Sequence, residues 1–314
     1  MKFLVVLLFL LAFAVAVHLL AGAREDRWEA RFPPLGQFLD VDGTRVHALV
    51  KGEGPDLVLI HGSSGNLRDF SFALMDRLAE DYRVIAFDRP GLGYTDRLQD
   101  RGATIAEQAA LLQGAAAQLG ADRPLVLGQS YGGAVALSWA VTRPKAVAGL
   151  VLVSSPTHPW DGHVPALYRA NGSTLGSAMA VPPITALVPR SYIRDQVRAV
   201  FDPEPAPEGY VDHFGAELAA RRVSLRANAK QRLGLLAQIT QMQPHYGELA
   251  LPIELIHGTA DTTVGLSIHA EKFIRQVPKA NLVRLEGVGH LPHHTAPEAT
   301  RAAIDRAAAR AGLR

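Results

Sequence analysis

The sequence predicts an α/β fold in which a mostly parallel sheet carries helices on both faces, and two observations lead to this prediction. Uniformly apolar runs, such as 57–60 and 147–153, alternate with helical segments at the spacing of βαβ units. A further apolar run, 125–129, leads into Gly128-Gln129-Ser130-Tyr131-Gly132 and then a helix. This is the G-x-S-x-G pattern in a strand-turn-helix context, where the serine stands on a sharp turn at the end of a strand.

The composition fits one large α/β domain or two smaller ones and excludes several classes of chemistry. The chain has 314 residues, of which 48% are hydrophobic, and this fraction is ample for a buried core. The formal net charge is +2 and the basic residues are scattered, so no nucleic-acid partner is expected. The absence of cysteine excludes disulfides, thiol catalysis and cysteine metal sites.

The amino terminus carries an almost unbroken apolar segment, 3–23, in which His18 is the only strongly polar residue. About 20 apolar residues are enough to span a bilayer, whereas a signal peptide has a shorter apolar core. Ala21-Gly22-Ala23 nevertheless resembles a cleavage site. We favour a membrane anchor that is not cleaved, with residues 1–30 as anchor and linker outside the fold and the globular part facing away from the cytoplasm. The alternative is a secreted or periplasmic protein after cleavage near Ala23.

The elements before residue 154 follow from turn and cap signals. Asp42-Gly43 predicts a hairpin, because Asp-Gly favours the turn between two antiparallel strands. Thr104 and Glu107 form a capping box that opens a helix, and Gly120 ends it. The expected strands are 37–40, 44–51, 57–60, 83–87, 124–129 and 147–153, and the expected helices are 67–80, 104–119 and 131–142.

The alternation breaks between residues 155 and 250, where the sequence carries no strong strand signal. The segment is rich in Pro, Gly, Ala and Arg, and a structureless loop of this length is rare in a compact domain. We therefore predict a helical lid, 155–250, over the carboxyl end of the sheet, inserted into a core of 31–154 and 251–314. Its expected helices are 192–201, 211–218 and 228–240, and the core resumes with strands 253–258 and 281–285 and helices 266–277 and 297–309.

Ser130 needs a base and a group that orients the base, because a serine hydroxyl alone is a poor nucleophile. Asp261 and His290 each follow the carboxyl end of a predicted strand, at the edge of a parallel sheet where sites form. We predict that His290 takes the Ser130 proton and that Asp261 fixes the tautomer of His290. The Tyr131 N–H, at the positive end of the next helix, is expected to hold the oxyanion.

The glycine-rich turn His61-Gly62-Ser63-Ser64-Gly65 has two interpretations. On its own it is a tight connection between a strand and a helix. Because a G-x-S-x-G motif follows downstream, we favour the second interpretation, in which the Ser63 N–H is the other arm of an oxyanion hole. His61 and His257 end buried strands next to glycines, so we expect them to be structural and to brace the two catalytic loops.

Other interpretations of the acid and the base remain open. Asp261 lies in Gly-Thr-Ala-Asp-Thr-Thr, where an aspartate is commonly a turn residue. His293 and His294 are fallback candidates for the base, and their clustering permits a metal site. No carboxylate pattern typical of metal ligands accompanies them, so we expect neither a metal nor a cofactor. Asp88 and Asp96 are expected to brace their loop through backbone N–H groups.

Five motifs in this order resemble the α/β-hydrolase superfamily, in particular its lid-bearing esterases, carbon–carbon bond hydrolases and cofactor-free haloperoxidases. The motifs are His61-Gly62-Ser63-Ser64-Gly65, Asp88-Arg89-Pro90-Gly91-Leu92-Gly93, Gly128-Gln129-Ser130-Tyr131-Gly132-Gly133, His257-Gly258-Thr259-Ala260-Asp261 and Gly289-His290. The resemblance covers residues 37–312 and implies an eight-stranded, mostly parallel sheet with a helical lid between the sixth and seventh strands. Haloalkane dehalogenases and epoxide hydrolases of this superfamily use an aspartate nucleophile. Ser130 takes that place here, so neither activity is expected.

The sequence thus predicts a serine hydrolase that cleaves a small or medium apolar ester, thioester or carbon–carbon bond through an acyl-enzyme. A hydrolase-like ligand receptor without turnover and a perhydrolase or haloperoxidase with the same triad are the alternatives. Arginines of the lid offer a site for an acidic substrate, although such side chains are more often solvated. These arginines are Arg169, Arg190, Arg194 and Arg198.

Overall fold

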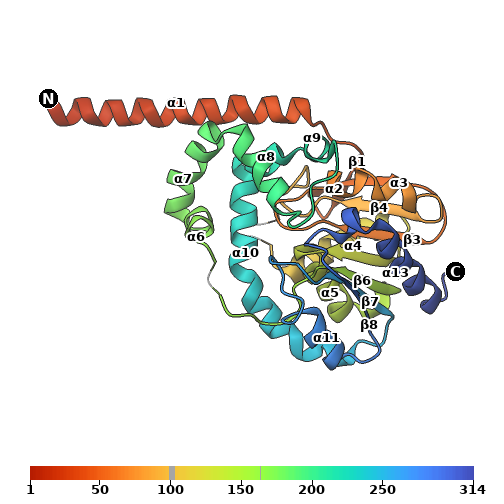
Figure 1. The fold of residues 1–314 in the computed structure, drawn as a ribbon. Helices are drawn as coiled ribbons and strands as arrows, with labels where there is room; N and C mark the ends of the chain where they lie inside the picture. Colours follow the sequence, from red (N-terminus) through yellow and green to blue (C-terminus); the bar gives the residue numbers. More distant parts are fainter. Residues whose placement is uncertain (99–102, 163) are drawn as a thin grey trace.

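The structure is a computed structural model that describes residues 1–98, 103–162 and 164–314. Its centre is an eight-stranded sheet with the strand order β1-β2-β4-β3-β5-β6-β7-β8 (Figure 1). The strands are β1 (Gln37–Val41), β2 (Thr44–Lys51), β3 (Asp56–Ile60), β4 (Arg83–Phe87), β5 (Leu125–Gln129), β6 (Gly149–Val153), β7 (Ile253–Gly258) and β8 (Asn281–Leu285). The predicted strands are therefore all present, with boundaries that shift by at most a few residues.

The sheet is parallel except at one edge. β1 pairs antiparallel with β2, and β2 pairs antiparallel with β4, whereas every other neighbouring pair is parallel. The β1–β2 turn uses positive φ angles at Asp42 (51°) and Gly43 (79°), which is the backbone shape that an Asp-Gly turn favours. The predicted α/β-hydrolase sheet, eight-stranded and mostly parallel, is confirmed.

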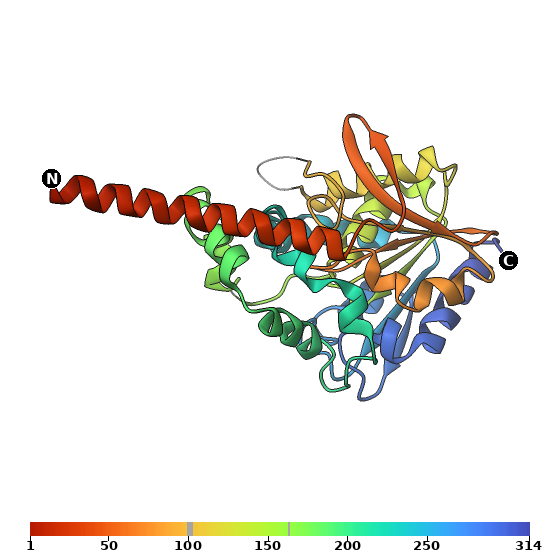
Figure 2. The ribbon, with the colours of Figure 1, turned by 90° about the horizontal axis from the view of Figure 1, so that it is seen from above.

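Alternate residues of the central strands enter two apolar cores, one on each face of the sheet. On one face Val58 and Val126 pack with residues of α4 (Ile105–Gln118) and α5 (Tyr131–Thr142). On the other face Leu57 and Leu127 pack with residues of α3 (Leu74–Leu78) and α13 (Pro297–Arg310). Figure 2 shows the two helical layers on opposite sides of the sheet. This arrangement fixes the strand ends, because successive residues of a strand point to opposite faces.

Two predicted helices of the core differ from the structure. The helix expected at 67–80 is divided into α2 (Arg68–Ser71) and α3, because Ala73 leaves the helical conformation with φ −152°. The helix expected at 266–277 begins later, as α11 (Ala270–Gln276). His269 ends the preceding turns, and its Nδ1 accepts hydrogen bonds from the backbone N–H groups of Thr157 and His158. In both places tertiary contacts limit a helix that the local pattern allows.

The segment between β6 and β7 is a helical insertion, as expected. Its helices are α6 (Ala166–Gly172), α7 (Thr174–Leu187), α8 (Arg190–Ala199), α9 (Tyr210–Phe214) and α10 (Arg222–Met242), with short 3₁₀ turns η2 (Ala216–Ala220) and η3 (Gln243–Glu248). The sequence predicted the positions of α8, α9 and part of α10. It did not predict α6 and α7, because Gly172, Pro182 and Pro183 interrupt the pattern there.

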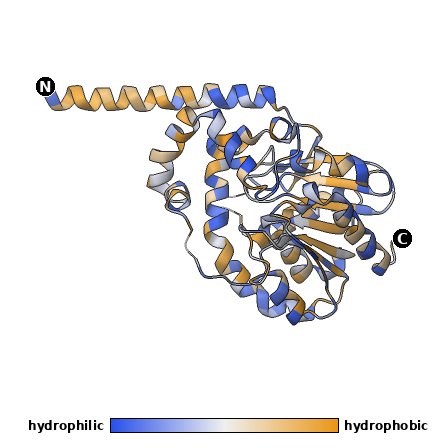
Figure 3. Ribbon diagram, viewed as in Figure 1, coloured by the Kyte–Doolittle hydropathy of each residue, from blue (hydrophilic) through white to orange (hydrophobic). Residues whose placement is uncertain are grey.

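The N-terminal helix α1 (Lys2–Arg31) is a single continuous helix whose first half projects from the rest of the molecule (Figures 1 and 2). It is long and apolar enough to cross a membrane by length and composition, and Figure 3 shows the change from apolar to polar residues along it. Its second half packs on the insertion, where Val17, Ala21 and Trp28 are buried. The expectation that residues 1–30 lie outside the fold is therefore wrong for this second half.

Candidate active site

Ser130 stands on a strained turn between β5 and α5. Its backbone has φ 50° and ψ −122°, and a positive φ is rare for a residue with a side chain. The glycines of the motif are required by close contacts. A Cβ atom on Gly128 would lie 2.3 Å from the carbonyl oxygen of Gly132, and one on Gly132 would lie 2.1 Å from that of Ile60. The turn predicted from G-x-S-x-G is therefore present, and it presents Ser130 at the carboxyl edge of the sheet.

The turn after β3 lies against the Ser130 turn. A Cβ atom on Gly62 would lie 3.2 Å from the Ser130 Cβ and 2.3 Å from the Gln129 Oε1. The insertion also holds this turn, because the Asn228 Oδ1 of α10 accepts a hydrogen bond of 3.0 Å from the Ser64 N–H. Ser63 is thus beside the serine turn, and Tyr131 begins α5 directly after it. The roles of the Ser63 and Tyr131 N–H groups in an oxyanion hole stay predictions.

Arg89 holds the backbone of the turn that follows β3. Its guanidinium donates hydrogen bonds of 2.9 Å to the carbonyl oxygens of His61 and Gly62, and it lies 4.3 Å from the centre of the Tyr131 ring. The backbone N–H of Arg89 donates a hydrogen bond to the His61 Nε2, so this ring nitrogen must be unprotonated. Burial lowers the pKa of His61 to about 4, with a further contribution from Arg89. His61 is therefore a neutral structural residue, as expected.

Asp261 and His290 form a buried pair at the ends of β7 and β8. The His290 Nδ1 lies 2.8 Å from the Asp261 Oδ2, while the Asp261 Oδ1 accepts hydrogen bonds of 2.9 Å from the N–H groups of Thr263 and Val264. Burial raises the pKa of Asp261, but hydrogen bonds from His257 and His290 outweigh it and hold the pKa below its usual value. The carboxylate is thus charged at neutral pH and orients the imidazole so that Nε2 is free for proton transfer.

His257 supports the carboxylate from behind. Its Nε2 lies 2.7 Å from the Val264 carbonyl oxygen and 3.3 Å from the Asp261 Oδ2, so one N–H is shared between the two acceptors. His257 is 1% exposed, so this contact is buried. His257 thus braces the loop that carries Asp261, and the catalytic role of that loop stays a prediction. The sequence showed its place beside a glycine but not its contact with Asp261.

The strand ends bring Ser130 and His290 to the same region. β5 and β8 lie in one sheet, and the Gln129 side chain donates a hydrogen bond of 3.4 Å to the His290 carbonyl oxygen. Within the described residues, the Ser130 hydroxyl makes no hydrogen bond with His290. The structure thus shows the Asp261–His290 pair and the serine turn, and the proton transfer between Ser130 and His290 stays a prediction.

The loop that carries His290 is held by the insertion. The Glu204 Oε2 accepts a hydrogen bond of 2.7 Å from the Gly289 N–H. A Cβ atom on Gly289 would lie 2.2 Å from the Asp202 carbonyl oxygen, so this close approach requires glycine. The residue before His290 is therefore clamped to the segment between α8 and α9.

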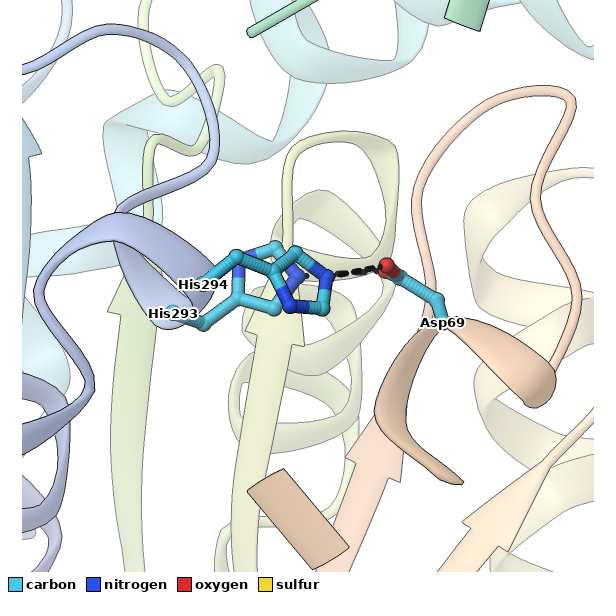
Figure 4. A group of neighbouring side chains, drawn as sticks. All are labelled: Asp69, His293 and His294. Atoms are coloured by element: carbon cyan, nitrogen blue, oxygen red, sulfur yellow. Dashed lines mark hydrogen bonds and ion pairs between the residues drawn. The ribbon is translucent and has the colours of Figure 1, made fainter. Parts of the chain in front are cut away.

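His293 and His294 belong to a separate buried cluster with Asp69 (Figure 4). The His294 Nε2 lies 2.7 Å from the Asp69 Oδ1 and the His293 Nε2 lies 3.2 Å from the Asp69 Oδ2. The Tyr210 hydroxyl donates a third hydrogen bond of 2.6 Å to Asp69. The fallback hypothesis that either histidine is the base is not supported, because both face Asp69 instead of the Asp261–His290 pair.

The ligand atoms of Asp69, His293 and His294 lie within 4.8 Å of one another, so the cluster has the dimensions of a metal site. Both carboxylate oxygens already accept hydrogen bonds, and burial lowers the pKa of His293 to about 4. Its hydrogen bonds join α2, α12 (Pro292–Thr295) and α9. No sequence signal pointed to Asp69 or Tyr210, since neither stands in a motif.

Asp88 braces its loop, as expected. Its Oδ1 accepts a hydrogen bond from the Leu67 N–H and its Oδ2 accepts one from the Tyr94 N–H, while the His47 Nδ1 lies 2.6 Å from the Oδ2. Among the described residues, Asp96 forms an exposed ion pair of 3.3 Å with Arg45. Its loop continues into residues 99–102, which lie outside the described residues, so the brace expected of Asp96 stays a prediction.

Three of the four arginines considered for an acidic substrate make ion pairs within the insertion. Arg194 pairs with Asp212 at 2.6 Å and Arg198 pairs with Asp195 at 2.7 Å. Arg190 pairs with the buried Glu217 at 2.5 Å. The arginine contacts favour a structural and solvated role over recognition of an acidic substrate.

Comparison with known proteins shows to which family this architecture belongs. The profile of the Alpha/beta hydrolase family matches residues 57–303, which is most of the chain. The chain belongs to the alpha/beta hydrolase family. The match spans β3 to α13 and includes the turns that carry Ser130, Asp261 and His290. The resemblance inferred from the five sequence motifs is confirmed.

The proteins that are similar to this alpha/beta hydrolase have several different activities. The chain is 28% identical over 289 residues to haloalkane dehalogenase 2 of Mycobacterium tuberculosis, covering 87% of this chain and 94% of the relative. It resembles the crystal structure of esterase RhEst1 from Rhodococcus sp. ECU1013, with 25% identity, a TM-score of 0.66 and coverage of 88% and 99%. A membrane phospholipase A structure shares the fold, with 22% identity, a TM-score of 0.68 and coverage of 98% of each chain. That last superposition extends over most of α1.

Proposed function

We propose that this alpha/beta hydrolase is a serine hydrolase that cleaves a small or medium apolar ester, thioester or carbon–carbon bond. The observation that supports the proposal most directly is the buried Asp261–His290 pair beside the strained turn that carries Ser130. A charged carboxylate behind a neutral imidazole is the arrangement that lets a histidine accept the proton of a serine hydroxyl. The chain's membership of a hydrolase family supports the same reaction class.

The proposed reaction has two steps. His290 takes the proton of the Ser130 hydroxyl through Nε2 as the oxygen attacks the substrate carbonyl, and Asp261 stabilises the imidazolium through Nδ1. The N–H groups of Ser63 and Tyr131 stabilise the oxyanion. His290 then returns the proton to the leaving group, and a water molecule activated by His290 hydrolyses the acyl-enzyme.

The residue at the nucleophile position supports an ester-type reaction over dehalogenation. One relative is haloalkane dehalogenase 2 of Mycobacterium tuberculosis, and enzymes of that class use a carboxylate nucleophile. This chain has Ser130 on the turn, and a serine forms an acyl-enzyme that is hydrolysed at its carbonyl carbon. The similarity to esterase RhEst1, at 25% identity, agrees with this assignment.

We also propose that α1 anchors the protein in a membrane, with the globular part outside the cytoplasm and the helical insertion acting as a lid. The contacts of α1 support an uncleaved segment. Ala21 is fully buried in a continuous helix, and Glu25 forms an ion pair of 2.6 Å with Arg222 of the insertion. Cleavage near Ala23 would cut this helix between two of its contacts with the insertion.

The test is labelling of the full-length protein in detergent with a fluorophosphonate probe. Wild-type protein should be labelled, Ser130→Ala should not, and Ser267→Ala, an exposed serine, should be labelled like the wild type. A panel of p-nitrophenyl esters of graded chain length then measures turnover. Tight ligand binding without labelling or turnover would contradict the proposal and indicate a receptor. Halide oxidation with acetate and peroxide would indicate perhydrolysis by the same triad.

A further inference from the structure

The most exposed apolar side chains after α1 gather in one part of the insertion. Among the described residues that follow α1, every large apolar side chain that is more than half exposed lies between positions 167 and 192. They are Leu167 (55%), Leu175 (72%), Met179 (69%), Leu187 (60%) and Tyr192 (55%). Scattered apolar residues are normal on a protein surface, but a concentration of this kind marks an interaction surface.

Three of these side chains lie on α7. Leu175 and Met179 are four residues apart, so they project from nearly the same side of the helix, and Leu187 is turned by about 80° from Met179. The other side carries Val181 and Thr185, which are buried against the rest of the insertion. α7 has no charged residue, and Figure 3 shows it as an apolar to neutral helix.

The end of α7 is docked on the apolar part of α1. Val17 and Ala21 form a buried cluster with Ala186. Arg24 donates hydrogen bonds of 2.7 Å and 2.8 Å to the carbonyl oxygens of Ala186 and Val188. The helix rises about 10 Å from Val17 to Arg24, so α7 contacts the last turns of the apolar segment of α1. Figure 1 shows one end of α7 beside α1 and α6 farther from it, both on the side of the globular part that faces the N-terminus of α1.

The length of the apolar segment sets the depth of this contact. The helical segment 3–23 rises about 31 Å, which matches a hydrocarbon core of about 30 Å. If the whole segment is buried in lipid, the membrane surface must reach the level of Val17 to Arg24, and therefore also the end of α7. His18, the polar residue of the segment, lines a cavity with Glu25, Arg222 and Arg226 on the protein side of α1.

We propose that the apolar face of α6 and α7, formed by Leu167, Leu175, Met179 and Leu187, lies in the interfacial layer of the bilayer that α1 crosses. The proposal rests on the membrane anchoring proposed above. The partner of this face is the boundary between phospholipid headgroups and acyl chains, where amphipathic helices bind. Arg24 and Arg27, at the end of the apolar segment, lie at the level of the headgroups and suit their phosphates. The insertion is then a second membrane contact beside α1.

The cysteine-free chain allows a direct test with single-cysteine variants of the full-length protein. Leu175→Cys and Met179→Cys report on the α6–α7 face, Leu11→Cys reports on the span of α1, and Phe38→Cys on β1 is the exposed apolar control. Each variant is labelled with an environment-sensitive NBD fluorophore. The proteins are placed in phosphatidylcholine and phosphatidylglycerol nanodiscs that contain doxyl-labelled phosphatidylcholine. All four positions are exposed, and unfolding curves in detergent confirm that each variant is folded.

The expected result is a blue shift and a loss of emission at positions 175 and 179 with a doxyl group near the headgroups. Position 11 should lose most emission with a deeper doxyl group, and position 38 should lose none. If 175 and 179 behave like 38 while 11 is quenched, the α6–α7 proposal is overturned and the anchor stands. If 11 is not quenched either, the anchoring itself fails. A blue shift without lipid quenching that disappears on dilution into excess nanodiscs would assign the face to a second copy and overturn the proposal.

Discussion

The His290 Nδ1 lies 2.8 Å from the Asp261 Oδ2 at the ends of two neighbouring strands, β7 and β8. The second carboxylate oxygen is occupied by two backbone N–H groups, so the carboxylate has one orientation in which to meet the imidazole. The pair is therefore preorganised before a substrate arrives, and preorganised groups stabilise developing charge at little cost in reorganisation.

Replacing Asp261 by asparagine should retain the fold and abolish most of the activity. The asparagine oxygen can still accept the Thr263 and Val264 N–H groups, but its amide would favour the wrong tautomer of His290. By analogy with serine proteases, the loss in kcat is about 10⁴-fold. Ester turnover measures the loss, and unfolding curves check the fold. A variant with wild-type kcat would show that Asp261 is only a turn residue.

His257→Leu should lower kcat with a smaller effect than loss of Asp261. The substitution removes the N–H that lies 3.3 Å from the Asp261 Oδ2, so the carboxylate loses one stabilising contact and its pKa should rise. Loss of such a supporting hydrogen bond typically costs about 10-fold to 100-fold in activity. His257→Gln, which keeps an N–H donor, should recover part of the loss. The pH–rate profile is the diagnostic readout, because a purely structural role would leave its acid limb in place.

The protein should lose stability as the pH falls from 6.5 to 4. Burial lowers the pKa of His61 to about 4, so in this range the unfolded chain binds a proton that the folded chain does not. Unfolding is then favoured as the pH falls, by up to about 3 kcal/mol for a shift of this size. Urea unfolding in detergent at pH 7 and pH 4.5 measures the change. His61→Gln should flatten the slope, His245→Gln at an exposed position should not, and equal slopes in all three proteins would contradict the assignment.

Tyr210→Phe should lower the free energy of unfolding by about 1–2 kcal/mol, because Asp69 would lose one of its buried hydrogen-bond donors. Asp69→Ala should cost more, about 3 kcal/mol, since it removes the common partner of Tyr210, His293 and His294. Asp76→Ala, on the exposed side of α3, is the matched control. Chemical denaturation measures all three. A chelator that destabilises wild-type protein by a similar amount would show that the cluster holds a metal.

Deletion of residues 1–31 should loosen the insertion while leaving the sheet intact. The deletion removes Glu25 and Glu29, which pair with Arg222 and Arg221, and it exposes Ala186. Limited proteolysis should therefore cut the segment 164–200 faster in the truncated protein. Identical cleavage rates with and without α1 would show that these contacts do not stabilise the insertion.

Most of the sheet and the core helices could be predicted from the sequence, because local signals and tertiary structure agree there. The strands are uniformly apolar, Thr104 and Glu107 form the predicted capping box, and Gly120 has the positive φ of 75° that a helix end requires. The Asp261–His290 pair followed from the topology, since parallel strands place their carboxyl ends at one edge. The family match agrees with the five sequence motifs.

Other features depend on contacts between distant segments and leave no local signal. Phe72 packs edge-on against Tyr210, 138 positions away, where the predicted helix 67–80 is divided. α7 contains Pro182 and Pro183, which favour a loop locally, yet packing against α1 and α10 keeps it helical. The cluster of Asp69 with His293 joins residues more than 200 positions apart. Such pairs become visible only once the chain is folded.

The hydrogen bond between Glu204 and Gly289 couples movement of the insertion to movement of the loop that carries His290. Any movement of the insertion that breaks this hydrogen bond also frees the backbone next to His290. The orientation of the imidazole is then no longer fixed. Product release and the restoration of His290 as a proton acceptor would then occur at the same rate. In such a protein, variants that slow the movement lower turnover without weakening substrate affinity.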